Sequence, residues 1–346
     1  MQTSRIFGWY VTEISPRAEL RPRAHIGGLA HRVARRWIVL CALALSLAVG
    51  PSSWAQSLPP DAPLEVREVA PGVFVHFGVN ALMTAENEGA TANVGFIVGN
   101  DAVAVIDSGG SLLEGRRLLE AVRNITTKPI RYVINTHAHP DHVFGNAAFR
   151  DPATVFVGHR NMPRALALRG PHYLDAFRRS MGPLVADIEL VAPQQIVETE
   201  LALDLGQRVL RLRAWAIAHS DSDLTVFDEA SGILFSGDLV FIEHIPVVDG
   251  SLRGWLAAIE MLAGIPAMRV IPGHGPMAEW PAALVGERRY LERLAQDIRG
   301  MINDGTPIAQ AATAGLSEKS RWELFEEYNA RNATAAFAEL EWEQPR

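Results

Sequence analysis

Short apolar runs alternate with polar or glycine-rich turns from about residue 64 onward. Runs of this length, rich in valine and isoleucine, are typical of β-strands. The turn Gly99-Asn100-Asp101 lies between two such runs and is typical of a hairpin. For the first half, the pattern predicts strands at 64–69, 73–77, 94–98, 102–106, 130–135 and 154–157, and helices at 112–122 and from 142 to about 149.

The second half repeats this order of elements. Its pattern predicts strands at 188–197, 201–205, 208–214, 224–228, 233–236 and 269–271, and helices at 159–182 with a break at Gly170-Pro171, at 252–263 and at 282–301. The tail at 322–340 is predicted to be an acidic amphipathic helix that packs on the outside with a solvated face. A strand-rich half followed by helices, occurring twice, predicts an α/β fold in which two sheets pack face to face with helices outside.

The first 55 residues differ in composition from the rest. A basic segment ending at Arg35-Arg36 precedes the apolar run Trp37 to Val49, and Ser53-Trp54-Ala55 follows. This order predicts a secretory signal at 1–55, cut after Ala55, with an extended tether at 56–63. A retained membrane helix is the alternative, but the apolar run is shorter than the roughly 20 residues that a bilayer requires. We therefore expect a periplasmic or secreted protein with no stable membrane anchor.

Length, charge and cysteine content narrow the function classes. The chain has 346 residues, of which 48% are hydrophobic and 21% charged, so it can bury a large core. Its formal net charge is −7, and removal of the basic leader would leave a still more acidic chain. An acidic protein is a poor candidate for binding nucleic acid. Cys41 lies in the leader, so the rest of the chain has no disulfide, no thiolate nucleophile and no cysteine ligand.

The richest candidate chemistry lies in the segment 136–142, Thr-His-Ala-His-Pro-Asp-His, directly after a predicted strand. In an extended segment alternate side chains share a face, so His137 and His139 point the same way. Beyond the proline the chain turns, and Asp141 and His142 can face a second point nearby. Imidazole and carboxylate ligands suit zinc, and iron or manganese less exclusively. The segment therefore predicts a metal site.

Three further candidates lie at or near the ends of later apolar runs: His219, Asp238 and His274. Glycine on both sides of His274 lets the backbone approach whatever the ring binds. Asp221 and Asp223 are interpreted either as acceptors that orient the ring of His219 or as ordinary loop and cap residues.

Four other histidines are weighed against this set. His244 is a candidate for lining the pocket, because it follows Asp238 closely. Packing or surface roles are expected for His76, His159 and His172.

Together these motifs resemble the metallo-β-lactamase fold superfamily: H-x-H-x-D-H, a lone histidine, an aspartate after Ser-Gly, and Gly-His-Gly, over roughly residues 64–280. Asp107 before Ser-Gly-Gly matches the early structural aspartate of that superfamily. The resemblance implies its four-layer αββα sandwich, with a hydrolase domain at 64–310 and a helical extension at 311–346. It further implies that His137, His139 and His219 hold one zinc ion, that Asp141, His142 and His274 hold another, and that Asp238 bridges them.

A dinuclear zinc site predicts a hydrolase in which a metal-bridging hydroxide attacks the substrate, with Asp141 and Asp238 as the catalytic carboxylates. The expected substrates are small molecules with an ester, lactone, amide, thioester or phosphoester bond. The runs at 91–97, 135–149 and 237–255 are similar to exported zinc metallohydrolases of quinoprotein (PQQ-dependent) systems, also called SoxH-like, which implies a possible quinoprotein dehydrogenase system as partner. The alternatives are a β-lactamase, an iron-dependent sulfur oxygenase, and a non-catalytic periplasmic protein that handles a metal or cofactor.

Overall fold

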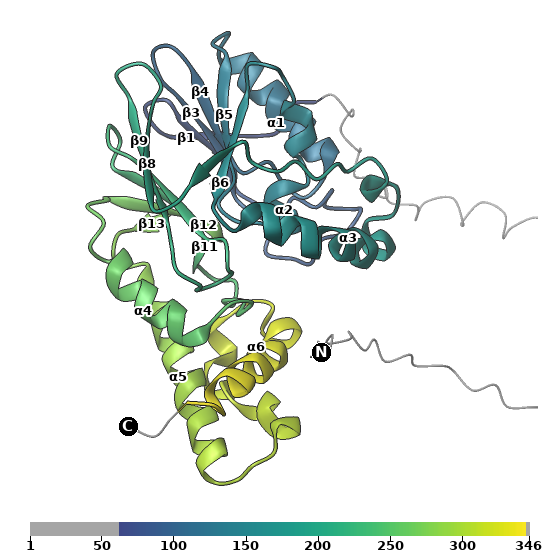
Figure 1. Cartoon of the computed structure of the whole chain (residues 1–346), viewed down its shortest axis with the longest axis vertical. Helices are drawn as coiled ribbons and strands as arrows, with labels where there is room; N and C mark the ends of the chain where they lie inside the picture. The colour runs from purple at the N-terminus through teal and green to yellow at the C-terminus, as the bar shows by residue number, and fades with distance from the viewer. Residues whose placement is uncertain (1–61, 344–346) are drawn as a thin grey trace, which may run out of the picture. The chain divides into compact units, whose positions relative to one another are not determined.

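Two β-sheets form the centre of the fold in the computed structural model, which describes residues 62–343 (Figure 1). The predicted signal at 1–55, with its cleavage point after Ala55, and residues 56–61 of the predicted tether lie outside the described residues. The first sheet has its seven strands in sequence order: β1 (Arg67–Ala70), β2 (Val73–His76), β3 (Val94–Val98), β4 (Val103–Ile106), β5 (Ile130–Ile134), β6 (Val155–His159) and β7 (Gln195–Val197). The six-stranded second sheet has the order β13 (Ala278–Glu279), β12 (Arg269–His274), β11 (Ile233–Phe241), β10 (Leu224–Asp228), β9 (Val209–Ala214) and β8 (Glu200–Asp204).

The two sheets pack against each other through one buried apolar cluster. Ile97 and Ile106 of the first sheet belong to this cluster together with Val226 and Phe235 of the second. Alternate residues of a strand point to opposite faces, so Phe96, next to Ile97, packs on the other side of the first sheet. The strands from β4 to β7 pair in parallel, and β5 delivers the 136–142 segment at its carboxyl end. This is where sites form in layered α/β folds.

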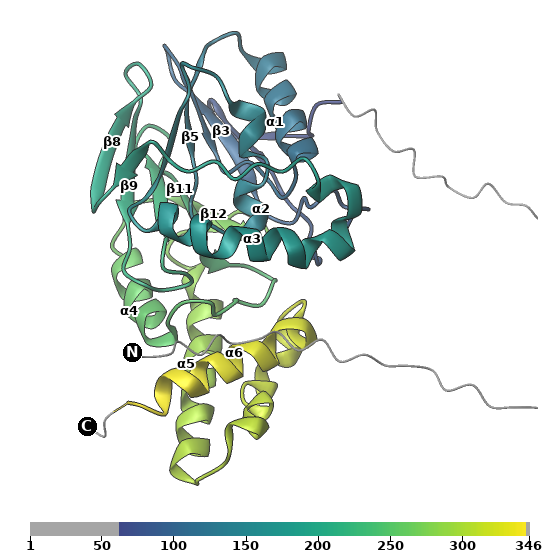
Figure 2. The ribbon, with the colours of Figure 1, turned by 45° about the vertical axis from the view of Figure 1, so that its right-hand side comes forward.

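Helices cover the outer face of each sheet. α1 (Leu112–Ile125) lies on the first sheet, where Leu118 packs with Phe96, and the Ser111 hydroxyl caps it by accepting from Glu114 N at 3.1 Å. Next to it are α2 (Pro140–Val143), η1 (Asn146–Phe149), α3 (Met162–Met181) and η2 (Gly182–Val185) (Figure 2). The second sheet is covered by α4 (Leu252–Leu262) and α5 (Leu284–Asn303), and η3 (Ile308–Thr313), η4 (Leu316–Arg321) and α6 (Phe325–Leu340) pack beside α5.

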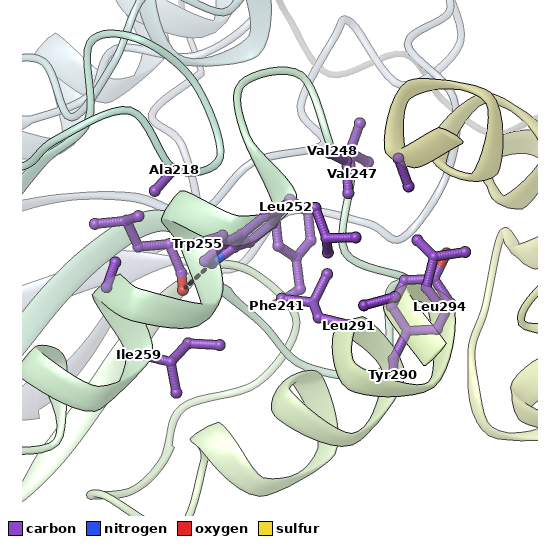
Figure 3. Close-up of a cluster of buried hydrophobic side chains, with 14 of the residues drawn as sticks. Ala218, Phe241, Val247, Val248, Leu252, Trp255, Ile259, Tyr290, Leu291 and Leu294 are labelled. Atoms are coloured by element: carbon purple, nitrogen blue, oxygen red, sulfur yellow. Dashed lines mark hydrogen bonds between the residues drawn. The ribbon is translucent and has the colours of Figure 1, made fainter. Parts of the chain in front are cut away.

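The core under the second group of helices is dominated by large side chains (Figure 3). Trp255 of α4 is fully buried against Phe241 and donates its indole N–H to the Leu239 carbonyl at 3.2 Å. The prediction of two facing sheets with helices outside is therefore confirmed. Among residues 62–343, no helix combines the length and the apolar character needed to cross a bilayer.

Two predicted features of the middle of the chain are wrong. The strand predicted at 188–197 is limited to Gln195–Val197, because Pro193 has no N–H for a sheet ladder and Val191 packs under the first sheet instead. The helix break at Gly170-Pro171 is absent, and α3 runs through Pro171. Side chains beyond the proline, including Phe177, pack into a cluster with Phe144, and this tertiary contact outweighs the local cost of proline.

The C-terminal tail forms α6, which is amphipathic as predicted, but its inner face does more than cover the core. Asn332 is fully buried and donates to the Pro246 carbonyl at 2.6 Å and to the Tyr290 hydroxyl at 2.9 Å. The Val248 N–H donates to the Asn332 side-chain oxygen at 2.9 Å. These bonds fix α6 against the loop between β11 and α4, and this loop reaches the candidate site.

Candidate metal centre

The ends of four strands carry the seven candidate ligands to one place. His137 and His139 follow β5, Asp141 and His142 lie in α2, His219 follows β9, Asp238 lies within β11 and His274 ends β12. The structure brings all of them together in two groups whose ligand atoms lie within 4.8 Å of one another: His137, His139, His219 and Asp238 in the first, and Asp141, His142 and His274 in the second.

Asp238 lies between the two groups. Its Oδ2 is 3.6 Å from His137 Nε2 and 3.3 Å from His219 Nε2, both of the first group. Its Oδ1 is 3.1 Å from His142 Nε2 and 3.5 Å from His274 Nε2, both of the second group. A Cβ on Gly273 would lie 1.9 Å from Asp238 Oδ1, so only glycine permits this approach. One carboxylate thus presents one oxygen to each group.

Several polar atoms at the centre lack a hydrogen-bond partner. Within residues 62–343, His137 Nε2, His142 Nε2 and Asp238 Oδ1 are buried and make no hydrogen bond. Buried polar atoms are normally satisfied, and an unsatisfied one costs about 1–3 kcal/mol. A cation at each group would give these three atoms the partner that they lack, so the residues present fit a metal.

The opposite ring nitrogens of three histidines are fixed by acceptors. His219 Nδ1 donates to the Val247 carbonyl at 2.8 Å, and His274 Nδ1 donates to the Thr91 carbonyl at 2.9 Å. His142 Nδ1 donates to Asp107 Oδ2 at 2.8 Å. A proton held at Nδ1 leaves the Nε2 lone pair for the centre, which is the arrangement that metal-binding histidines require.

Asp107 organises the loop below the second group. Its φ is 56°, in the left-handed region, which aspartate tolerates better than most residues. One carboxylate oxygen accepts from Thr136 N at 2.8 Å, and the other accepts from Thr136 Oγ1 at 2.7 Å besides His142. Because the Thr136 proton goes to Asp107, the Thr136 oxygen accepts from His137 Nδ1 at 3.1 Å. Asp107 therefore orients ligands of both groups.

His139 uses its nitrogens in the opposite sense. Its Nε2 donates to Asp249 Oδ2 at 3.0 Å, and its Nδ1 faces His219 Nε2 at 2.9 Å. Asp249 also accepts from Arg169 of α3 and, at 2.5 Å, from Arg331 of α6. The carboxylate thus holds the His139 tautomer that exposes Nδ1 to the first group, and two guanidinium groups hold the carboxylate.

The electrostatics of the centre favour a bound cation. Burial keeps the pKa of His137 well below its ordinary value and lowers the pKa of His219 to about 3, so both rings are neutral and able to bind a metal. Burial alone would raise the pKa of Asp238, but the surrounding imidazoles, led by His274, hold it well below its ordinary value. Burial likewise opposes protonation of His142, yet Asp238 and Asp107 raise its pKa well above 6.5. Asp238 is therefore ionised, and a metal cation at the second group would take the place of the proton that His142 holds.

The contacts of Asp221 and Asp223 decide between the two interpretations of these residues. Asp223 does not orient His219, because its carboxylate accepts from Ser220 N and Ser220 Oγ, and His219 Nδ1 is bonded to a backbone carbonyl. The interpretation of this segment as loop and cap residues is the one that the contacts support. Asp221 uses its backbone carbonyl to accept from Asn161 Nδ2 at 2.7 Å.

His244 lies beside the second group, with its ring centroid 4.9 Å from that of His274. The histidines expected outside the site lie outside it. His159 is buried and bonds through Nε2 to the Trp215 carbonyl at 3.0 Å, which is a packing role. His76 bonds to the Glu65 carbonyl at 2.8 Å, and His172 is exposed on α3.

Sequence reasoning missed the residues that surround His139. Asp249 lies in a run that resembles a known subgroup, but nothing in that run indicates its bond to His139. Arg169, Tyr173 and Arg331 lie on two helices far apart in the chain, so no local spacing could show that they meet at Asp249. Only the packing of α3 and α6 brings them together.

Comparisons with known proteins agree with this geometry. The model of the Metallo-beta-lactamase superfamily matches residues 88–274, which is more than half of the chain. Among curated proteins, the probable metallo-hydrolase YqjP of Bacillus subtilis (strain 168) is 23% identical over 243 residues, which are 60% of this chain and 75% of that protein.

Two solved structures are similar in fold. The sec-alkylsulfatase Pisa1 from Pseudomonas sp. superposes with a TM-score of 0.64 and 16% identity, over 79% of this chain and 50% of that chain. A metallo-beta-lactamase from Pontibacter korlensis superposes with a TM-score of 0.55 and 20% identity, over 66% of this chain and 99% of that chain. At these identities the likeness concerns the fold.

Proposed function

The chain belongs to the metallo-beta-lactamase superfamily and is a metal-dependent hydrolase of that superfamily, and we propose that it holds two zinc ions and cleaves ester-type bonds of small molecules. His137, His139 and His219 would hold one ion, and Asp141, His142 and His274 the other. Asp238 would contact both. The bond cleaved is a carboxylic ester, lactone, amide or thioester bond, or a phosphoester bond.

A single observation carries this proposal. The two oxygens of Asp238 face two separate groups of imidazoles, and buried nitrogens of both groups lack any hydrogen bond within the described residues. A site for one metal ion would need only one of these groups. Each group together with Asp238 offers four protein ligands and no cysteine, and water or substrate would take the fifth position that catalytic zinc can adopt.

The zinc ions, when bound, would supply an activated water and polarise the carbonyl or phosphoryl oxygen of the substrate. The chain's own residues prepare the site for this chemistry. Asp107 accepts from His142 Nδ1 and Asp249 accepts from His139 Nε2, so His142 Nε2 and His139 Nδ1 are the nitrogens turned toward the metal positions. Asp141 and Asp238 are the carboxylates that would contact the ions, and the Asp141 side chain is 15% exposed against 5% for Asp238, so Asp141 would lie nearer to an entering substrate.

Two finer proposals come from the sequence. The leader at 1–55 supports export, and the runs at 91–97, 135–149 and 237–255 support membership of the exported SoxH-like subgroup of quinoprotein systems. The partner would then be a quinoprotein (PQQ-dependent) dehydrogenase system. Growth on an alcohol that requires such a dehydrogenase, with and without the gene for this chain, tests this role. Unchanged growth of the deletion strain would refute it.

A substrate panel tests the proposed chemistry. Protein purified without added metal is analysed for zinc, iron and manganese, and then assayed on carboxylic esters, lactones, thioesters, phosphoesters, a β-lactam and an alkyl sulfate. The alkyl sulfate is included because Pisa1 has the same fold. We expect zinc-dependent turnover of an ester-type substrate that a chelator abolishes and added zinc restores. Asp238→Asn should abolish it, whereas the control Asp204→Asn, in the hairpin of β8 and β9, should not.

Turnover that survives chelation would refute the proposal. Iron with oxygen consumption would favour the sulfur oxygenase, and turnover restricted to the β-lactam would favour the lactamase. Tight metal binding with no turnover on any member of the panel would favour the protein that handles a metal or cofactor.

A further inference from the structure

Two arginines from distant helices meet beside the candidate metal centre. Arg169 of α3 and Arg331 of α6 both donate to Asp249, and Asp249 accepts from His139 on its inner side. The guanidinium groups are therefore separated from the first group of ligands by only one carboxylate and one imidazole. Figure 2 shows α3 in teal and α6 in yellow, and Asp249 lies in the loop that joins β11 to α4.

Two positively charged groups share one carboxylate in this cluster. The guanidinium groups of Arg169 and Arg331 both pair with Asp249, which also bonds to His139. The side chains of Arg169 and Arg331 are 40% and 37% exposed, whereas Asp249 is 15% exposed. The positive groups thus lie toward solvent and the negative group lies below them. On a chain with a formal net charge of −7, two guanidinium groups gathered at one partly exposed point are a distinct local feature.

Arg169 has donors to spare. Both of its hydrogen bonds to described residues use Nη1, one to Asp249 and one to the Tyr173 hydroxyl at 3.4 Å. Its Nε and Nη2 make no hydrogen bond to any residue between 62 and 343. Tyr173 lies one helical turn further along α3, and its ring centroid is 6.1 Å from that of His139. Since the Tyr173 oxygen accepts from Arg169, its own proton can be donated to a bound group.

We propose that Arg169, Tyr173 and Arg331 form a subsite for an oxyanion of the substrate, so that the enzyme selects esters whose acyl or alkyl part carries a carboxylate or a sulfate. The proposal rests on the proposed metal-dependent hydrolase, since it takes the metal centre as the place of reaction. Guanidinium groups bind carboxylate and sulfate through paired N–H donors, which a lysine cannot imitate. Asp249 holds both arginines in place before substrate arrives, which lowers the entropy cost of binding.

Arg331 lies outside the part of the chain that matches the family model. The family model ends at residue 274, and Arg331 lies beyond it, on α6. α6 is fixed by the buried bonds of Asn332 next to the loop that carries Asp249. The C-terminal segment would therefore contribute to substrate selection as well as to the core.

A simpler role for the arginines is to hold Asp249, and thereby His139, in position. The two roles differ in a measurable way. If the arginines only hold His139 in position, their loss should weaken the binding of every molecule that binds the metal by the same factor. Arginines that bind an oxyanion affect anionic ligands and leave neutral ones nearly unchanged.

Small thiols separate these roles without any need for turnover, because a thiolate binds zinc directly. Calorimetry on the zinc-loaded protein measures Kd for mercaptoethanol, which is neutral beyond its thiol, and for mercaptoacetate and mercaptosuccinate, which carry carboxylates. The variant is Arg169→Met. The matched control is Arg164→Met, which removes the same charge from an exposed position of α3. Zinc content is measured for each protein.

We expect the carboxylate thiols to lose about 10- to 100-fold in affinity in Arg169→Met, the range for a charged hydrogen bond, while mercaptoethanol changes little. Tyr173→Phe should show a smaller loss of the same kind, and Arg164→Met none. An unchanged ratio of carboxylate to neutral affinity in Arg169→Met, or an equal loss for all three thiols, would overturn the subsite alone. Failure of the zinc-loaded wild type to bind any thiol would refute the metal centre and both proposals.

Discussion

Replacing Asp107 by asparagine tests how far the metal centre depends on the residues behind its ligands. Asp107 accepts three hydrogen bonds, from Thr136 N, Thr136 Oγ1 and His142 Nδ1, at 2.7 to 2.8 Å. Asparagine keeps the size of the side chain and tolerates the left-handed backbone, with its φ of 56°. The substitution therefore changes the chemistry of the carboxylate and leaves the backbone in place.

The cost follows from the geometry. A carboxamide has one acceptor oxygen, so its NH₂ group must face a donor in either orientation. If the oxygen faces His142 and Thr136 Oγ1, the NH₂ group faces Thr136 N, and one buried charged hydrogen bond is lost, at about 1.5–3 kcal/mol. The opposite orientation breaks two. His142 also loses the ion that fixes its proton at Nδ1, and loss of such a partner lowers metal affinity by roughly 10- to 100-fold.

The assay is competition for zinc with a chromophoric chelator, together with thermal unfolding of the metal-free protein. We expect one of the two zinc affinities to fall by about 1.4 to 2.8 kcal/mol. The control is Asp204→Asn, which replaces a turn carboxylate that accepts from Gly206 N at 2.9 Å, outside the metal centre. Two unchanged zinc constants in a folded Asp107→Asn protein would show that the support by Asp107 has no effect on the metal.

Three other substitutions test single side chains of the structure. Asp238→Asn should weaken both zinc sites and reduce turnover by more than the roughly 100-fold that loss of a supporting residue costs, and a variant that retained two ions at full affinity would contradict the bridging role. Burial raises the pKa of Glu114 to about 8 from 4.5, so the unfolded chain releases this proton at a lower pH than the folded one. Stability should therefore fall as pH rises between these values, by up to about 1.4 kcal/mol per pH unit from this group, and denaturant titrations should show a shallower fall in Glu114→Gln. Tyr290→Phe removes a buried hydroxyl that donates to Asn329 at 3.0 Å and accepts from Asn332 at 2.9 Å, so urea unfolding should report a loss of about 1–3 kcal/mol with an unchanged m value. Equal free energies of unfolding for the wild type and Tyr290→Phe would show that these two hydrogen bonds do not contribute to stability.

The sheets and the seven candidate ligands could be anticipated because their signals are local. Each strand is a short run bounded by a turn, and each ligand lies at or near the end of such a run, as His219 and His274 do. The carboxyl ends of parallel strands lie at one edge of a sheet, so residues that follow such strands can be expected to lie close together.

The features that the sequence analysis missed depend on contacts between distant segments. α3 continues through Pro171 because later side chains such as Phe177 pack with Phe144, which no local rule records. The bonds from Arg169 and Arg331 to Asp249 join three segments, and their geometry follows from the packing of α3 and α6. Asp223 is close enough in sequence to His219 to have oriented its ring. Its carboxylate instead accepts from the N–H and the hydroxyl of Ser220, which are local donors.

The most direct test of the central claim is anomalous diffraction at the zinc edge from crystals of the zinc-loaded protein. The account predicts two peaks, one among His137, His139 and His219 and one among Asp141, His142 and His274, with Asp238 in contact with both. A single peak, or two peaks of which Asp238 contacts only one, would contradict it.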